Sequence, residues 1–271
     1  MAKNEEHKLD SKFIDLHIPS GVTGGGACLN RHKSEFSENH SCSHRWQAYL
    51  KAKECWQWYN YPAYQDLVKT SVKKIFKTTQ WGHFITSEKR PEPFGWDLTA
   101  TTSYTSRKVK NFVSWSMCPY WHQAHHIIPN GVLNNCIADA ANESIKVHTL
   151  TRVCLLQAKY NLNHKKNVIL LPMGKEVAAA LGLPRHIAGI EGDASGKHYM
   201  LCHPKYTNKV TSEVKKVIRG YAKQIDTQEH ETNNPELDKS KLENISVSIF
   251  NRLRSWQKKA KQGAPADDMP M

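Results

Sequence analysis

The chain has 271 residues, with 38 Lys and Arg against 25 Asp and Glu, so its formal net charge is +13. Hydrophobic residues make up 39% of it, which suits a packed core and excludes a largely disordered chain. No apolar run approaches the roughly 20 residues of a membrane helix, so we expect no membrane insertion. The first ten residues are polar and predict no secretory signal, and the seven cysteines are then expected to be reduced thiols.

Charge and aromatic residues are unevenly distributed along the chain. Residues 122–225 carry 14 basic and 6 acidic side chains, a net charge of +8, and seven of the eight tryptophans lie at or before Trp121. We therefore expect an aromatic-rich region over 1–117, a basic domain over 118–225, and a C-terminal helix with a loose tail over 226–271. The region over 1–117 has no motif, and as a hypothesis it serves delivery, acts as an adaptor or shapes the substrate site. A basic excess favours a polyanionic partner such as nucleic acid.

In the N-terminal half, the glycine-rich residues 20–26 predict a plain loop, because no Gly-Lys-Ser/Thr follows to form a phosphate-binding loop. Residues 108–115 are expected to form a strand. The aromatic residues between Trp46 and Tyr64 could stack on bases, although a packed core is the commoner use of such residues.

The second half is predicted to be mainly helical. A helix over 143–160 would bury Ile145, Leu150, Val153 and Leu156, and a short one is expected over 175–181. A helix over 209–223 has an apolar stripe at helical spacing: Val210, Val214, Val217, Ile218 and Tyr221. The last helix is expected to begin with Asn234 as N-cap and Pro235 as its first residue.

The most informative stretch is Trp121–Pro129, which contains the doublet His125-His126. Adjacent side chains at the end of a strand point to opposite faces, so one imidazole can bind a metal while the other faces a substrate. A neutral imidazole is both a good ligand for transition metals and a base near neutral pH. An isolated doublet is more often a pair of surface histidines, so the surrounding sequence decides.

Three motifs follow one another in the chain: Ala-His-His-Ile-x-Pro at 124–129, Asn-x-x-x-Leu-Pro at 167–172, and His-Pro-x-Tyr-x-x-x-Val at 203–210. In this order they resemble the AHH family of the HNH/endonuclease VII (ββα-metal, His-Me finger) nucleases, which occur in secretion-delivered bacterial toxins. The resemblance covers about residues 118–225. It implies an α+β fold, mostly helical, with a ββα-metal core and the aromatic-rich region before it.

The resemblance implies a metal-dependent endonuclease that hydrolyses phosphodiester bonds, with DNA favoured over RNA as substrate. His126 would be the general base, and Asn167 would orient it or help place the metal. His125 and His203 would hold one divalent ion (Mg²⁺, or Zn²⁺, Mn²⁺ or Ni²⁺), with His198 as a further candidate, whereas His186 is expected to be structural. A set of basic residues would hold the phosphate backbone without reading sequence: Lys205, Lys209, Lys215, Lys216 and Arg219.

As an antibacterial toxin, the protein would be cytoplasmic in its producer and delivered into a target cell without a Sec signal. Its expected partners are DNA or RNA, an immunity protein that is acidic where it meets the basic cleft, and a secretion-system carrier.

A different class of function stays open at this point, namely a nucleic-acid-binding or structural zinc protein without catalysis. The sequence His40-x-Cys42-x-His44, with Cys28, His32 and Cys55 nearby, could hold zinc. It lacks the Cys-x2-Cys pairs of common zinc modules, so buried thiols are the default interpretation.

Overall fold

The computed structural model describes residues 26–31, 36–55, 122–172, 178–179, 182–186, 203–227, 234–256 and 263–270. The strand expected over 108–115, the aromatic residues 56–64 and most of the short helix over 175–181 lie outside these ranges. The chain forms two compact units, and each draws residues from the N-terminal, middle and C-terminal parts of the chain. The division of the chain into the three consecutive parts 1–117, 118–225 and 226–271 stays a prediction.

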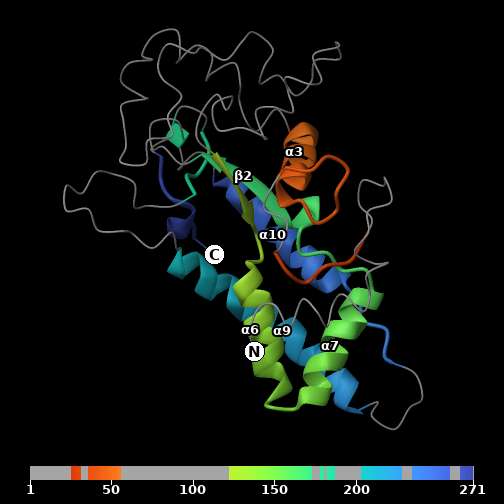
Figure 1. The fold of residues 1–271 in the computed structure, drawn as a ribbon. Helices are drawn as coiled ribbons and strands as arrows, with labels where there is room; N and C mark the ends of the chain where they lie inside the picture. The colour runs from red at the N-terminus through yellow and green to blue at the C-terminus, as the bar shows by residue number, and fades with distance from the viewer. Residues whose placement is uncertain are drawn as a thin grey trace, which may run out of the picture. The chain divides into compact units, whose positions relative to one another are not determined.

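The described elements are mostly helical (Figure 1). In chain order they are α3 (His44–Glu54), β1 (His122–His126), α6 (Asn130–Ala141), α7 (Ile145–Gln157), η3 (Lys165–Asn167), β2 (Val168–Pro172), α9 (Pro204–Thr227), α10 (Ser240–Ser255) and η4 (Ala266–Asp268). Strands β1 and β2 pair in a two-stranded sheet. This content agrees with the expected α+β class, while the assignment of a ββα core stays a prediction.

Helices α6 and α7 pack against each other in the first unit (Figure 1). Helix α6 ends at Ala141, and its C-cap Asn142 is in the left-handed conformation, with φ 45°. Ser144 caps α7 by accepting a hydrogen bond from the backbone N–H of Val147. The buried side chains of α7 lie in its C-terminal half. Ile145, which we expected on the buried face, is the first helical residue and is 71% exposed.

Helix α9 is longer than expected, because it begins at Pro204, whose fixed φ suits the first helical position. The predicted stripe is buried at Val210, Val214, Ile218 and Tyr221. The periodicity of the sequence therefore identified the buried face of this helix correctly.

Helix α10 begins at Ser240, and not at the predicted Asn234–Pro235 start. The carboxylate of Asp238 accepts a hydrogen bond from the backbone N–H of Ser240, at 2.9 Å, and so takes the capping role. Beyond this start, the expected apolar positions are buried: Leu242, Ile245, Ile249, Leu253 and Trp256.

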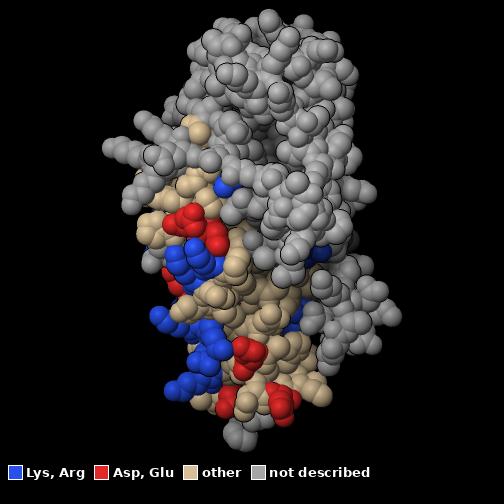
Figure 2. Space-filling view, turned by 90° about the vertical axis from the view of Figure 1, so that its left-hand side faces the viewer, with Lys and Arg blue, Asp and Glu red and all other residues tan. Residues whose placement is uncertain are grey.

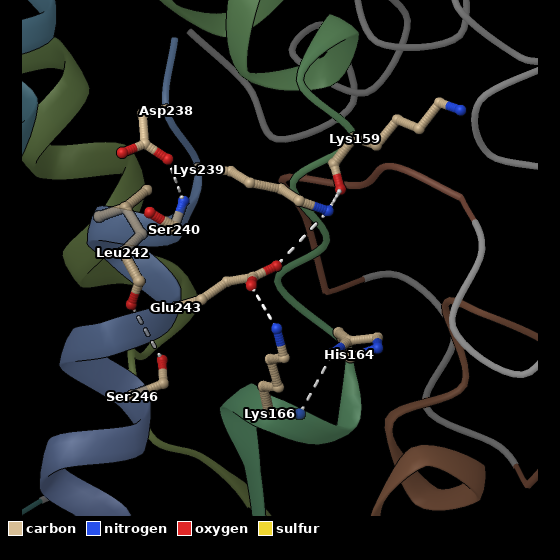
Figure 3. A network of polar contacts seen from close by, with 9 residues as sticks. All are labelled: Lys159, His164, Lys166, Asp238, Lys239, Ser240, Leu242, Glu243 and Ser246. Carbon is tan, nitrogen blue, oxygen red and sulfur yellow. Dashed lines mark hydrogen bonds and ion pairs between the residues drawn. The ribbon is translucent and has the colours of Figure 1, made fainter.

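Glu243 of α10 anchors this helix to the segment before β2 (Figure 3). Its carboxylate forms ion pairs with the ammonium groups of Lys166, at 2.5 Å, and Lys239, at 3.5 Å. The ammonium group of Lys239 also donates a hydrogen bond to the backbone carbonyl of Lys159. These bonds fix the loop that carries Asn163 and Asn167, whose contacts are described below.

Residues 263–270 belong to the part expected to be a loose tail, but the structure packs them in the second unit. Arg185 exchanges two backbone hydrogen bonds with this segment, one with Ala264 and one with Ala266. Ala266 and Met269 are almost completely buried. These contacts outweigh the entropy that a free terminus would keep.

Two further predictions from the sequence concern membrane-spanning helices and the cysteines. None of the described helices is long and apolar enough to cross a membrane. No disulfide is formed by the cysteines of the described ranges: Cys28, Cys42, Cys55, Cys136 and Cys154.

Candidate functional site

Three histidines of the second unit meet in one cluster: His125, His186 and His203. Each offers one ring nitrogen, and these atoms all lie within 4.8 Å of one another. The ring centroid of His125 lies 4.7 Å from that of His186 and 4.6 Å from that of His203. Among the described residues, this is the group of His, Cys, Asp and Glu side chains that could hold a metal ion.

Each histidine is placed by a different element. His125 lies on β1, and its paired strand β2 is buried at every residue. The backbone N–H of His186 donates to the carbonyl of Pro172, the last residue of β2, at 2.8 Å. His203 directly precedes α9. Residues that are 61 and 78 positions from His125 in the sequence are thus brought to the end of one small sheet.

The start of α9 is fixed by the C-terminal segment. The carboxylate of Asp267 accepts a hydrogen bond from the backbone N–H of Tyr206 at 2.7 Å, which satisfies a donor of the first helical turn. The buried Tyr206 ring packs edge-on against His125 and His203, with centroids 5.3 and 5.2 Å apart. Asp267 and Tyr206 therefore hold His203 in place beside the cluster.

The cluster has the chemistry of a transition-metal site. His125 Nδ1 and His186 Nε2 lie 2.8 Å apart, and burial lowers the pKa of His203, which keeps its imidazole neutral at neutral pH. Metal ligation requires neutral imidazole, and imidazole donors suit Zn²⁺, Ni²⁺, Cu²⁺ and Fe²⁺ more than Mg²⁺. The residues present therefore fit a divalent transition metal.

His126, the second residue of the doublet, has different surroundings within the first unit. Its Nε2 lies 3.0 Å from Oδ1 of Asn163, and its ring centroid lies 5.1 Å from that of His44. Only 5% of the residue is exposed. Burial, together with the charge of Arg31, lowers its pKa to about 4, so the ring is neutral at neutral pH and can accept a proton.

Asn167 uses all four hydrogen-bonding positions of its carboxamide. Its Oδ1 accepts from the backbone N–H of Ile128 at 2.8 Å and from the Ser246 hydroxyl at 2.7 Å. Its Nδ2 donates to the backbone carbonyls of Ile128 and Leu162, at 3.1 and 2.8 Å. We expected this amide to orient His126 or place the metal, but the structure uses it to tie three chain segments together.

The structure also shows which residues the sequence did not identify. His186, expected to be structural, lies in the cluster, and Asn163 makes the contact to His126 that we expected of Asn167. His186 falls outside the three motifs, so only its residue type could have suggested it. Asn163 lies only four residues before Asn167, so its position could have suggested it, but the family motif pointed to Asn167 instead. His198 lies outside the described residues.

The basic residues expected to bind nucleic acid differ in their surroundings. Lys205 pairs with Asp268 at 3.5 Å and Lys215 with Asp139 at 2.8 Å. Lys216 and Arg219 are exposed on α9, and Lys209 is half-buried. Figure 2 shows Lys and Arg side chains gathered along one side of the described part of the molecule, with acidic side chains among them.

The alternative zinc site near the N-terminus is not assembled by its described residues. Cys28 and Cys42 are buried, and the Cys28 thiol donates to the backbone carbonyl of Asn30 at 3.1 Å. Nδ1 of His40 accepts from the backbone N–H of Cys42 at 3.2 Å. These side chains serve local packing and turn formation, which agrees with the default interpretation; His32 lies outside the described ranges.

Comparison with known protein families identifies the family of this chain. Residues 110–249, more than half of the chain, match the AHH family, a nuclease family of the HNH/ENDO VII superfamily with a conserved AHH motif. No curated protein and no solved structure matches the chain. The match includes His125, His126, Asn167 and His203, and nucleases of this superfamily use a divalent metal. The chain therefore belongs to the AHH nuclease family.

Proposed function

We propose that this protein is a metal-dependent endonuclease that cleaves DNA, with His126 as its general base. The observation that carries the proposal is the different surroundings of two adjacent histidines. His125 lies among imidazoles that fit a transition metal, whereas His126 is buried, neutral and bonded to an amide. This is the division of labour that metal-assisted hydrolysis of a phosphodiester needs.

Within this proposal, His125, His186 and His203 would hold the metal, which when bound supplies positive charge to the scissile phosphate. His126 accepts the proton of the attacking water at a ring nitrogen. Lys216 and Arg219 attract the phosphate backbone, a sequence-independent contribution that falls with rising salt. Because the cluster consists of imidazoles, Zn²⁺ or Ni²⁺ is favoured over Mg²⁺.

We also propose that the protein is an antibacterial toxin, which its producer delivers into a target cell. The net charge of +13 supports a nucleic-acid substrate and an acidic immunity protein as partners. A pull-down from the producing cell would test for the immunity protein. The bait would be this protein, either with helix α9 intact or with Lys216 and Arg219 neutralised. Capture of the same protein by both forms, or of no acidic protein, would contradict this part of the proposal.

The nuclease activity is tested with plasmid DNA, the purified chain and each of Zn²⁺, Ni²⁺, Mn²⁺ and Mg²⁺. His126→Ala should lower the cleavage rate by about 10²–10⁴-fold, the usual contribution of a general base. His148→Ala, on α7, is the matched control and should cleave like the wild type. Equal cleavage by wild type and His126→Ala would refute the assigned base.

The same assay separates the alternatives. Cleavage of tRNA or rRNA but not of plasmid would identify an RNase. Salt-dependent binding without cleavage of any nucleic acid, with any of the metals, would identify a binding protein and overturn the proposal.

A further inference from the structure

The side chain of Asn163 bridges His126 and the N-terminal segment 26–31, which lies outside the family match. Its Oδ1 lies 3.0 Å from Nε2 of His126, and its Nδ2 donates to the backbone carbonyl of Asn30, also at 3.0 Å. Asn163 has no exposed surface, and its own backbone N–H donates to Oδ1 of Asn161 at 2.9 Å. Both the oxygen and the nitrogen of this carboxamide therefore have hydrogen-bond partners.

These contacts determine which nitrogen of His126 carries the proton. The carbonyl oxygen of Asn30 can only accept, so the NH₂ group of Asn163 must face it. The amide oxygen of Asn163 then faces His126 and also can only accept, so Nε2 of the neutral ring must be its protonated nitrogen. Nδ1 is then the unprotonated nitrogen, and it can receive a proton at its lone pair.

The carbonyl of Asn30 is itself held by the fold. Cys28 and residues 160–162 exchange two backbone hydrogen bonds, Cys28 N–H to the Tyr160 carbonyl at 3.0 Å and Leu162 N–H to the Cys28 carbonyl at 2.7 Å. The Asn30 side chain accepts from Asn134 of α6 at 3.3 Å. The N-terminal segment is thus bonded to the chain directly before Asn163 and to α6.

His44 restrains the same imidazole from a second direction. Its ring is buried, and the planes of His44 and His126 are inclined by 36°. His44 is the first residue of α3 and also lies before the residues that match the family. Two parts of the N-terminal region therefore contact the surroundings of the candidate base.

We propose that Asn163 is the positioning residue of His126, and that the Asn30 carbonyl sets the orientation of Asn163. The N-terminal segment then completes the nuclease site, and is more than a delivery or adaptor region. Asn163 keeps His126 as the Nε2-protonated tautomer and directs the lone pair of Nδ1 to the attacking water. The catalytic part of this inference rests on the proposed function, whereas the tautomer does not.

The tautomer is measured on the full chain with ¹⁵N-labelled histidine, by long-range ¹H–¹⁵N correlation at pH 7.5, with His126→Gln to assign the signals. In the wild type, Nε2 of His126 should be the protonated nitrogen. Asn163→Ala should give a mixture of both tautomers. Asn135→Ala, which replaces an exposed asparagine on α6, is the control and should leave the signals unchanged.

Cleavage of plasmid DNA provides the second readout. Asn163→Ala should lower kcat by at least about tenfold while KM stays within about twofold, because orientation and not substrate binding is lost. Asn163→Asp keeps an acceptor for Nε2 and should recover part of kcat, with the wild-type tautomer. Asn135→Ala should keep the wild-type kcat.

Two results would overturn the proposal: a His126 proton on Nδ1 in the wild type, or an Asn163→Ala variant with unchanged tautomer and kcat. The wild-type measurement needs no variant, so the proposal can fail even if Asn163→Ala does not fold. If the wild type cleaves no nucleic acid, the proposed function fails, and the NMR signals still decide the tautomer.

Discussion

Replacing Asn167 tests whether this asparagine is a structural tie or part of the chemistry. In Asn167→Ala, the backbone N–H of Ile128 loses its acceptor, and the carbonyls of Ile128 and Leu162 lose their donor. All three groups are buried with Asn167. An unsatisfied buried backbone group costs about 1–3 kcal/mol, and the removed amide leaves a small cavity.

We therefore expect Asn167→Ala to lower the free energy of unfolding by about 3–5 kcal/mol, a large share of the usual 5–15 kcal/mol. Ser246→Ala is the matched control. It removes one hydrogen bond to the same amide oxygen, which keeps its bond to Ile128, and should cost only about 1 kcal/mol. Asn167→Asp keeps the acceptors but cannot donate to the two carbonyls, so it should resemble the alanine variant.

The assay is urea unfolding followed by circular dichroism and analysed by linear extrapolation. Metal affinity of the folded variants is measured beside it by calorimetry. The reasoning is refuted if Asn167→Ala unfolds within about 1 kcal/mol of the wild type. A variant of wild-type stability that binds metal weakly would instead place Asn167 in the metal site.

Three further predictions concern metal binding, pH and nucleic acid. His186→Ala should lower the affinity for Zn²⁺ in calorimetry by at least about tenfold, and unchanged affinity would remove His186 from the metal site. Burial lowers the pKa of His164 to about 4 from 6.5, so the unfolded chain takes up its proton first and this contribution to stability is lost as pH falls through that window. Urea midpoints of His164→Gln should consequently change less between pH 6.5 and 4 than those of the wild type; an equal change would contradict this. Replacing Lys216 and Arg219 with Gln should weaken DNA binding equally on all sequences and reduce the salt slope by about 1 for each residue, and an unchanged slope would exclude α9 as the contact surface.

The sequence alone determined the features that repeat or lie close together in the chain. The spacing of Val210, Val214, Ile218 and Tyr221 identified the buried face of α9, because a helix brings every third or fourth residue to one side. The three short motifs predicted the family, which the match over 110–249 shows. Each of these signals is local, so it survives without knowledge of the packing.

Only the tertiary structure decided which polar side chains meet. His186 lies 61 residues from His125, and Asn30 lies 133 residues from Asn163, yet each pair is joined by a hydrogen bond. These residues lie in loops or at element ends, where no periodic pattern marks a buried position. Their contacts depend on how a two-stranded sheet, the ends of helices and the terminal segments pack, and the physical reason is that a buried polar group must find a partner wherever the fold provides one.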